Sequence, residues 1–218
     1  MKTKFAVLAC VMTGAIGAAI GSLAVAGGDA HKAPDHKGSA PEMKLPAGWT
    51  MEDMQACMDA GTLGDMHKEL AKGTGQWTGK TTQWMAPGAD PVYSDCTNTV
   101  TMVMDGRFQK CEFNGEMPGM GPFTGLGYQG YDNVSKKFVA TWMDNMGTGI
   151  MFGTGERSAD GKAITWTYTA NCPLTKKPTT MREIQRFLGD KSMTMEMHCT
   201  DPKTGKEFKC MEIELTRK

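Results

Sequence analysis

The sequence has 218 residues, the length of one ordinary domain with short additions. Its charge is balanced, with 24 basic and 24 acidic residues, so it lacks the basic surplus of nucleic-acid-binding proteins and no nucleic-acid partner is expected. Glycine occurs 27 times and methionine 20 times. Abundant glycine and threonine with scattered aromatic residues favour many short strands joined by tight turns.

Residues 1–26 have the pattern of a secretory signal peptide. Lys2 and Lys4 give a positively charged start, the stretch from Phe5 to Val25 is uncharged, and Ala24-Val25-Ala26 is a small-residue cleavage site. We therefore expect an exported protein, periplasmic or secreted, without stable membrane insertion after cleavage. An uncleaved anchor stays open, because about 20 apolar residues span a bilayer. Cys10 comes too early for a lipidation site and is interpreted as part of the apolar run.

Residues 27–48 are predicted to be a flexible linker, and residues 49–218 a helical lead-in plus a β-barrel domain. The linker is rich in Gly, Ala, Pro and Lys and has no periodicity. A helix is predicted over 50–60, because Thr50 and Asp53 have the spacing of a capping box and Gly61 follows. A second short helix is predicted over 64–72, and both helices are expected to pack against the strands that follow.

After Gly75 the sequence alternates with a period of two, which predicts about ten strands. These cover residues 76–85, 92–104, 107–115, 123–131, 137–145, 148–157, 162–171, 179–188, 191–200 and 207–217. Turn signals such as Asp105-Gly106 indicate hairpins between sequential strands. Because ten sequential strands must protect their edges, we predict an all-β, antiparallel up-and-down β-barrel, lipocalin-like, with a short N-terminal helical segment. A monomer is expected.

Six cysteines follow the predicted signal peptide, and in an exported protein an even number permits disulfides. A two-residue turn at Asp105-Gly106 places Val100 opposite Cys111. Cys96 then lies about 13 Å along the ladder from Cys111, too far for a disulfide. We expect one or two disulfides at most, with buried free thiols.

In the last hairpin, strand alternation argues against a disulfide between Cys199 and Cys210. Pairing Met197 with Ile213, and Met195 with Leu215, keeps the apolar faces together. This register puts the two cysteines on opposite faces, so they are predicted not to bond unless a β-bulge intervenes.

Motifs of catalysis are scarce in the sequence. There is no HExxH, CxxC, P-loop or GxSxG pattern. The GxGxxG string from Gly125 to Gly130 lies inside a strand pattern with no helix after it, so it is not interpreted as a dinucleotide site. An enzyme at the barrel mouth would have to use Asp144, Arg107 or His67, and this stays an alternative. No catalytic residue and no cofactor are predicted.

The methionine-rich run from Met193 to Cys199 resembles a soft-metal site, because thioether and thiolate ligands suit Cu(I). Methionine also takes the place of Leu and Ile elsewhere in this chain, including on the first predicted helix. Core or pocket lining is therefore the favoured interpretation. Copper binding is the alternative, and no metal site is predicted.

Aromatic and methionine side chains inside the barrel are the candidate ligand pocket. They are Trp142, Trp166, Tyr168, Met195, Met197 and Met102. Barrels of eight or more strands can hold one small ligand. We expect non-catalytic binding of a small apolar ligand, and a completely filled core is the alternative.

Several short motifs in a fixed order resemble a bacterial family, the domain-of-unknown-function family numbered 1579. They are His67-Lys-Glu-Leu70, Gly75-Gln-Trp77, Gly106-Arg-Phe108, Pro122-Phe-Thr-Gly125, Gly130-Tyr-Asp-Asn133, Trp142-Met-Asp144 and Gly147-Thr-Gly149. The resemblance covers residues 43 to 217 and implies an exported, lipocalin-like, calycin-type barrel that holds an apolar ligand. It carries over no catalytic residues.

The start of the first strand, Gly75 to Gly79, is also similar to ten-stranded haem-binding barrels of the nitrobindin type. That resemblance implies an inward axial histidine. Strand parity points His198 outward, so haem binding is kept as a minor alternative.

Overall fold

The structure is a computed structural model that describes residues 45–218. The predicted signal peptide and the predicted linker as far as residue 44 lie outside the described residues. The described chain divides into two compact units after Thr62. No helix among residues 45–218 is long and apolar enough to cross a membrane.

The first unit contains helix α2 (Met51–Gly61), which begins where the capping pattern predicts. The Asp53 backbone N–H donates to Thr50 Oγ1 at 3.1 Å, and the Asp53 carboxylate accepts from the Thr50 N–H at 2.8 Å. This reciprocal capping box satisfies backbone donors that the first helical turn leaves free.

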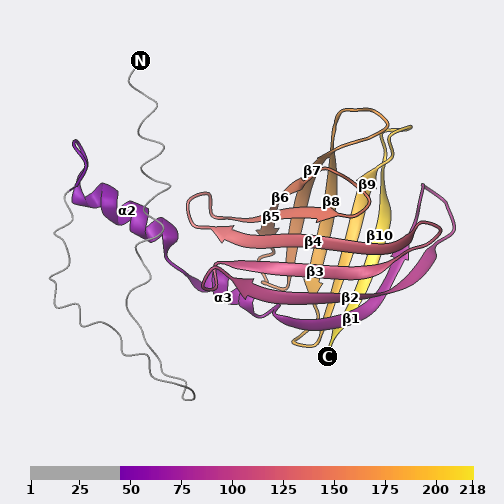
Figure 1. Cartoon of the computed structure of the whole chain (residues 1–218), viewed down its shortest axis with the longest axis horizontal. Coiled ribbons are helices and arrows are strands. Elements are labelled where there is room, and N and C mark those ends of the chain that lie inside the picture. The colour runs from indigo at the N-terminus through magenta and orange to yellow at the C-terminus, as the bar shows by residue number, and fades with distance from the viewer. Residues whose placement is uncertain (1–44) are drawn as a thin grey trace, which may run out of the picture. The chain divides into compact units, whose positions relative to one another are not determined.

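The second unit is a closed barrel of ten antiparallel strands (Figure 1), which confirms the predicted fold. The strands are β1 (Gly75–Gln83), β2 (Val92–Val103), β3 (Phe108–Met117), β4 (Gly121–Asp132), β5 (Lys137–Asp144), β6 (Met151–Arg157), β7 (Ala163–Asn171), β8 (Pro178–Phe187), β9 (Ser192–Thr200) and β10 (Glu207–Arg217). Each strand pairs with its neighbours in sequence, and β1 closes the barrel on β10. Helix α3 (Asp65–Ala71) packs at one end of the barrel against β3 and β4.

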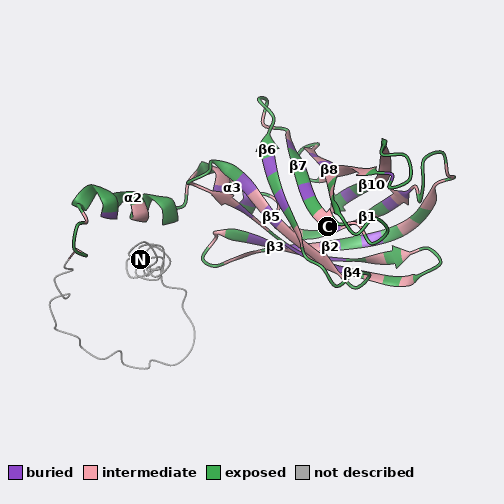
Figure 2. Cartoon of the chain, turned by 90° about the horizontal axis from the view of Figure 1, so that it is seen from above, coloured by how far each residue is buried: buried purple, intermediate pink, exposed green. Residues whose placement is uncertain are grey.

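Buried and exposed residues alternate along the strands, so one face of each strand forms the interior (Figure 2). In β7, Ile164, Trp166 and Tyr168 are buried, whereas Thr165 and Thr167 are exposed. The interior holds two apolar clusters. The first is centred on Trp77, Val100, Phe113, Met193, Ile213 and Leu215, and the second on Leu70, Phe138, Ala140, Ile164, Trp166 and Tyr168.

Glycines on the inward face make room for aromatic rings on the adjacent strand. Gly155 pairs with Trp166, and a Cβ atom at Gly155 would lie 2.7 Å from the indole ring. Gly127 pairs with Trp142, and a Cβ there would lie 3.0 Å from that ring. Closely packed interiors do not tolerate such overlap. The GxGxxG string therefore accommodates side-chain rings, in agreement with its interpretation as strand.

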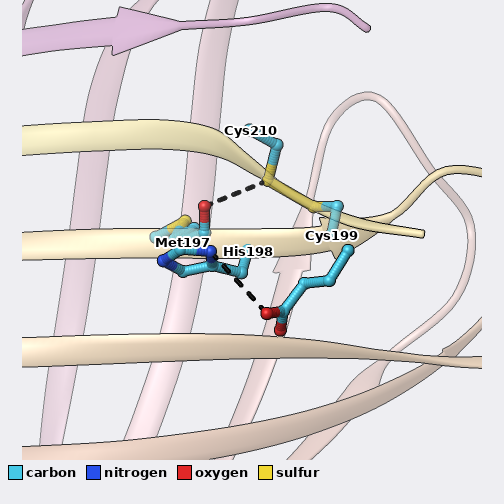
Figure 3. Close-up of a disulfide and its surroundings, with 5 residues drawn as sticks. Met197, His198, Cys199 and Cys210 are labelled. Atoms are coloured by element: carbon cyan, nitrogen blue, oxygen red, sulfur yellow. Dashed lines mark hydrogen bonds and ion pairs between the residues drawn. A yellow bond between two sulfur atoms is a disulfide. The ribbon is translucent and has the colours of Figure 1, made fainter. Parts of the chain in front are cut away.

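The last hairpin corrects two predictions. Met197 pairs with Met211, two residues from the expected partner, although the inward face stays the same. The register shifts between Lys209 and Met211, which makes Cys210 the extra residue of a β-bulge. The bulge lets Cys210 reach Cys199, and the two form a disulfide with a Cα–Cα distance of 5.8 Å (Figure 3). The expectation that they do not bond was wrong because the bulge is present.

The register around Asp105-Gly106 is confirmed, since Val100 pairs with Cys111 and Cys96 with Gly115. Cys96 and Cys111 are both free thiols. Burial raises the pKa of Cys96 to about 11 and that of Cys111 to about 12, with Asp95 and Glu183 respectively adding to the shift. Both are therefore protonated and unreactive inside the barrel.

Candidate functional site

The barrel contains a cavity of about 620 Å³ to which all ten strands contribute lining residues. This volume is in the range of small-molecule binding sites. The walls are mainly apolar, with aromatic rings on β1, β3 and β5 and methionines on β8, β9 and β10. The interior is therefore not completely filled by its own side chains.

Four of the six predicted pocket residues line this cavity, namely Trp142, Tyr168, Met195 and Met197. The other two belong to the packed part of the interior. Trp166 has 0% of its surface exposed, and its ring centroid lies 6.0 Å from that of Tyr168. Met102 packs against the second apolar cluster, to which both rings belong.

Trp142 is held in a fixed orientation at the cavity wall. Its indole N–H donates to the Asp144 carboxylate at 3.0 Å, and its ring meets Phe113 edge-on with the centroids 6.4 Å apart. The other Asp144 oxygen accepts from the Met146 backbone N–H at 3.0 Å. Asp144, which the enzyme alternative would use, therefore holds the Trp142 ring and the backbone at Met146 in place.

The other two residues of the enzyme alternative also make structural contacts. His67 Nδ1 accepts from the Gly64 backbone N–H at 3.1 Å, and its ring packs edge-on against Tyr131 at 6.0 Å. Arg107 donates to the Met104 carbonyl at 3.3 Å. Neither residue is part of the cavity lining.

The geometry weakens the copper and haem alternatives in specific ways. Cys199 is bonded to Cys210, so the run that begins at Met193 has no free thiolate at its end. Neither His67 nor His198 lines the cavity, and His198 Nε2 lies 2.6 Å from a Glu196 oxygen. Within residues 45–218, no three His, Cys, Asp or Glu side chains converge as a metal site.

Polar side chains inside the barrel are the feature that the sequence analysis missed. Glu183 on β8 lines the cavity with only 3% of its surface exposed, and burial raises the pKa of its carboxyl to about 7. Its Oε1 atom has no hydrogen-bond partner among the described residues, and the same holds for Gln83 Oε1 and Asn98 Oδ1.

Two buried glutamines do have hydrogen-bond partners. Gln185 accepts from the Trp166 indole N–H at 3.2 Å and donates to Met193 Sδ at 2.9 Å. Gln109 donates to the Leu70 carbonyl and so ties α3 to the barrel. Most buried polar groups in proteins are hydrogen-bonded. The absence of a partner is therefore unusual for the side-chain oxygens of Gln83, Asn98 and Glu183.

Comparison with known proteins gives a family and a structural relative. The model of the family described as "Protein of unknown function (DUF1579)" matches residues 62–217. No curated protein matches the sequence. The crystal structure of Rv2717c from M. tuberculosis matches with a TM-score of 0.56 and 16% identity, covering 72% of this chain and 99% of that chain. At this identity the likeness concerns the fold alone. Since the family model spans well over half of the sequence, the chain belongs to the DUF1579 family.

Proposed function

We propose that this protein is an exported, non-catalytic carrier whose barrel binds one small apolar ligand. The observation that carries the proposal is the interior cavity of about 620 Å³ with predominantly apolar walls. Small-molecule sites are concave, mostly apolar and supplied with a few polar groups that orient the ligand. This cavity has all three properties.

The side chains around the cavity suit a ligand of irregular shape. Met195, Met197 and Met211 have flexible, polarisable thioethers that adapt to the group packed against them. Trp142 supplies a rigid aromatic wall. A ligand that loses about 200 Å² of apolar surface here gains about 5 kcal/mol, from which the entropy of association must be subtracted.

The export part of the proposal depends on the N-terminal pattern of charge, apolar run and small-residue cleavage site. A carrier outside the cytoplasm would hold a poorly soluble molecule in an aqueous compartment. The monomeric state is supported by barrel closure, which leaves no free strand edge to pair with a second copy.

Native mass spectrometry of the protein purified from its own compartment tests the proposal. We expect an additional mass that is released on unfolding, and Met197→Trp, which fills the cavity, should abolish it. Thr167→Trp is the matched control, because Thr167 is exposed on the outer face of β7. A released haem or copper ion would support the corresponding alternative instead. Protein without added mass that also fails to bind apolar probes would contradict the proposal.

A further inference from the structure

Glu183 places a carboxyl group on the otherwise mainly apolar inner wall of the cavity. The pairing register places Glu183 beside Met197 on β9, Met197 beside Met211 on β10, and Met211 beside Gln83 on β1. These four side chains form one row along the inner wall. The carboxyl therefore lies within an apolar, thioether-rich surface, and no ion pair of Glu183 is present among the described residues.

The groups that face Glu183 do not supply a positive charge. Tyr168 on β7 and Cys111 on β3 both interact electrostatically with the carboxyl, and both are buried neutral groups. Two arginines that border the cavity are already engaged. Arg217 donates to the Thr74 carbonyl at 2.6 Å and lies over the Trp77 ring, whereas Arg157 pairs with Glu69 at 3.3 Å.

Three of the four unsatisfied polar atoms on the described cavity-lining residues are acceptors, and the fourth is the Arg217 Nε donor. Gln83 Oε1 and Asn98 Oδ1 are buried without a partner, as is Glu183 Oε1. Asn98 lies two residues from Val100, and Val100 pairs with Cys111. The Cys111 thiol interacts electrostatically with Glu183, so Asn98 is on the wall near both groups. A ligand that supplies hydrogen-bond donors would satisfy this interior, whereas a carboxylate ligand would place like charges together.

We propose that the cavity takes an amphiphilic amine, with its ammonium group donating to the Glu183 carboxylate and its apolar chain lying against the methionines and aromatic rings. This inference depends on the proposed carrier function and specifies its ligand class. An ammonium group brings three donors and the opposite charge, so it offsets the cost of the buried carboxylate in a way that a hydroxyl does not. The thioethers of Met197 and Met211, which follow Glu183 in the row, receive the first methylene groups of the chain.

Calorimetric titration of the purified protein with decylammonium, decanol and decanoate at pH 8 tests this assignment. The three probes share one chain and differ in the head group. We expect decylammonium to bind at least about tenfold more tightly than decanol, and decanoate to bind most weakly, because charge-assisted hydrogen bonds are about twice as strong as neutral ones. Glu183→Gln should bring decylammonium to the affinity of decanol and leave decanol within about threefold of its original affinity.

Glu214→Gln is the matched control, since Glu214 is an exposed carboxylate on β10. It should leave all three affinities unchanged, and circular dichroism should show that both variants are folded. If no probe binds, the carrier function itself is wrong. If decanol binds as tightly as decylammonium, or if Glu183→Gln changes neither affinity, the cavity binds ligands but the ammonium assignment is wrong. Preferred binding of decanoate would overturn the assignment in the same way.

Discussion

Replacing Glu183 by Gln should stabilise the barrel at alkaline pH and leave its stability at acid pH nearly unchanged. The substitution keeps the shape of the side chain and removes its ability to ionise. Glu183 is buried at 3% exposure, and burial raises the pKa of its carboxyl from 4.5 to about 7. The difference between the two proteins should therefore report on the cost of one buried carboxylate.

The sign and size of the effect follow from proton linkage. A pKa that is higher in the folded chain means that the folded state keeps its proton where the unfolded state has released it. The ionisation of Glu183 does not affect the stability of the folded protein below about pH 4.5. It lowers that stability as the pH rises to about 7, and its effect is then constant. At about 1.4 kcal/mol per pH unit, the ionised carboxylate costs about 3 kcal/mol above pH 7. For a chain of this size that corresponds to about 10 °C in melting temperature.

Urea denaturation at intervals between pH 4.5 and pH 8.5 measures this difference. Tyr168 and Cys111 have raised pKa values and titrate above the window, while Glu196 and Glu207 have lowered pKa values and titrate below it. The gap between Glu183→Gln and the native protein should open from about zero to about 3 kcal/mol. Glu214→Gln should follow the native curve. Parallel curves for Glu183→Gln and the native protein would refute the argument that burial disfavours the charge.

Three further outcomes are expected from the packing and the cysteines. Gly155→Ala should destabilise the barrel by about 1–3 kcal/mol in urea denaturation, whereas Gly149→Ala, with no atom within 4 Å of its new Cβ, should stay within about 0.5 kcal/mol of the native protein. Cys199→Ala should lower stability by about 3 kcal/mol, because the disulfide to Cys210 closes a chain segment of 11 residues, and reduction of the native protein should give the same loss. Iodoacetamide should label Cys172 before the buried barrel thiols, since hydrogen bonds from Thr175 lower its pKa, and equal labelling in a peptide map would indicate that the barrel opens.

The fold was predictable because its determinants are local. Alternation of apolar and polar residues marks each strand, and turn residues mark each connection. The Asp105-Gly106 turn is an example, since its two residues determine that Val100 pairs with Cys111 in the neighbouring strand. With connections this short, sequential antiparallel pairing follows, and closure is the remaining way to remove the edges.

The polar interior was harder to predict because both faces of β8 are mixed. A two-residue turn at Gly189-Asp190 would pair Arg186 with Met193 and turn Ile184 inward. In the structure Phe187 pairs with Met193, so the loop is one residue longer and Glu183 faces the interior. The bulge at Cys210 is a second single-residue change of this kind. Sequence alternation alone does not specify such offsets, because their energies depend on the neighbouring strands.

The cost of Glu183 is itself an argument for function. The fold does not require a carboxyl at this position, since its neighbours in the wall row, Met197 and Met211, are apolar, and Gln185 on the same face of β8 is neutral with both hydrogen bonds made. A methionine or glutamine would avoid the loss of about 3 kcal/mol at neutral and alkaline pH. Groups that lower stability without a structural role are expected mainly at functional sites. A ligand that pairs with the carboxylate would recover part of this free energy on binding, so binding and folding should be coupled through the same ionisation.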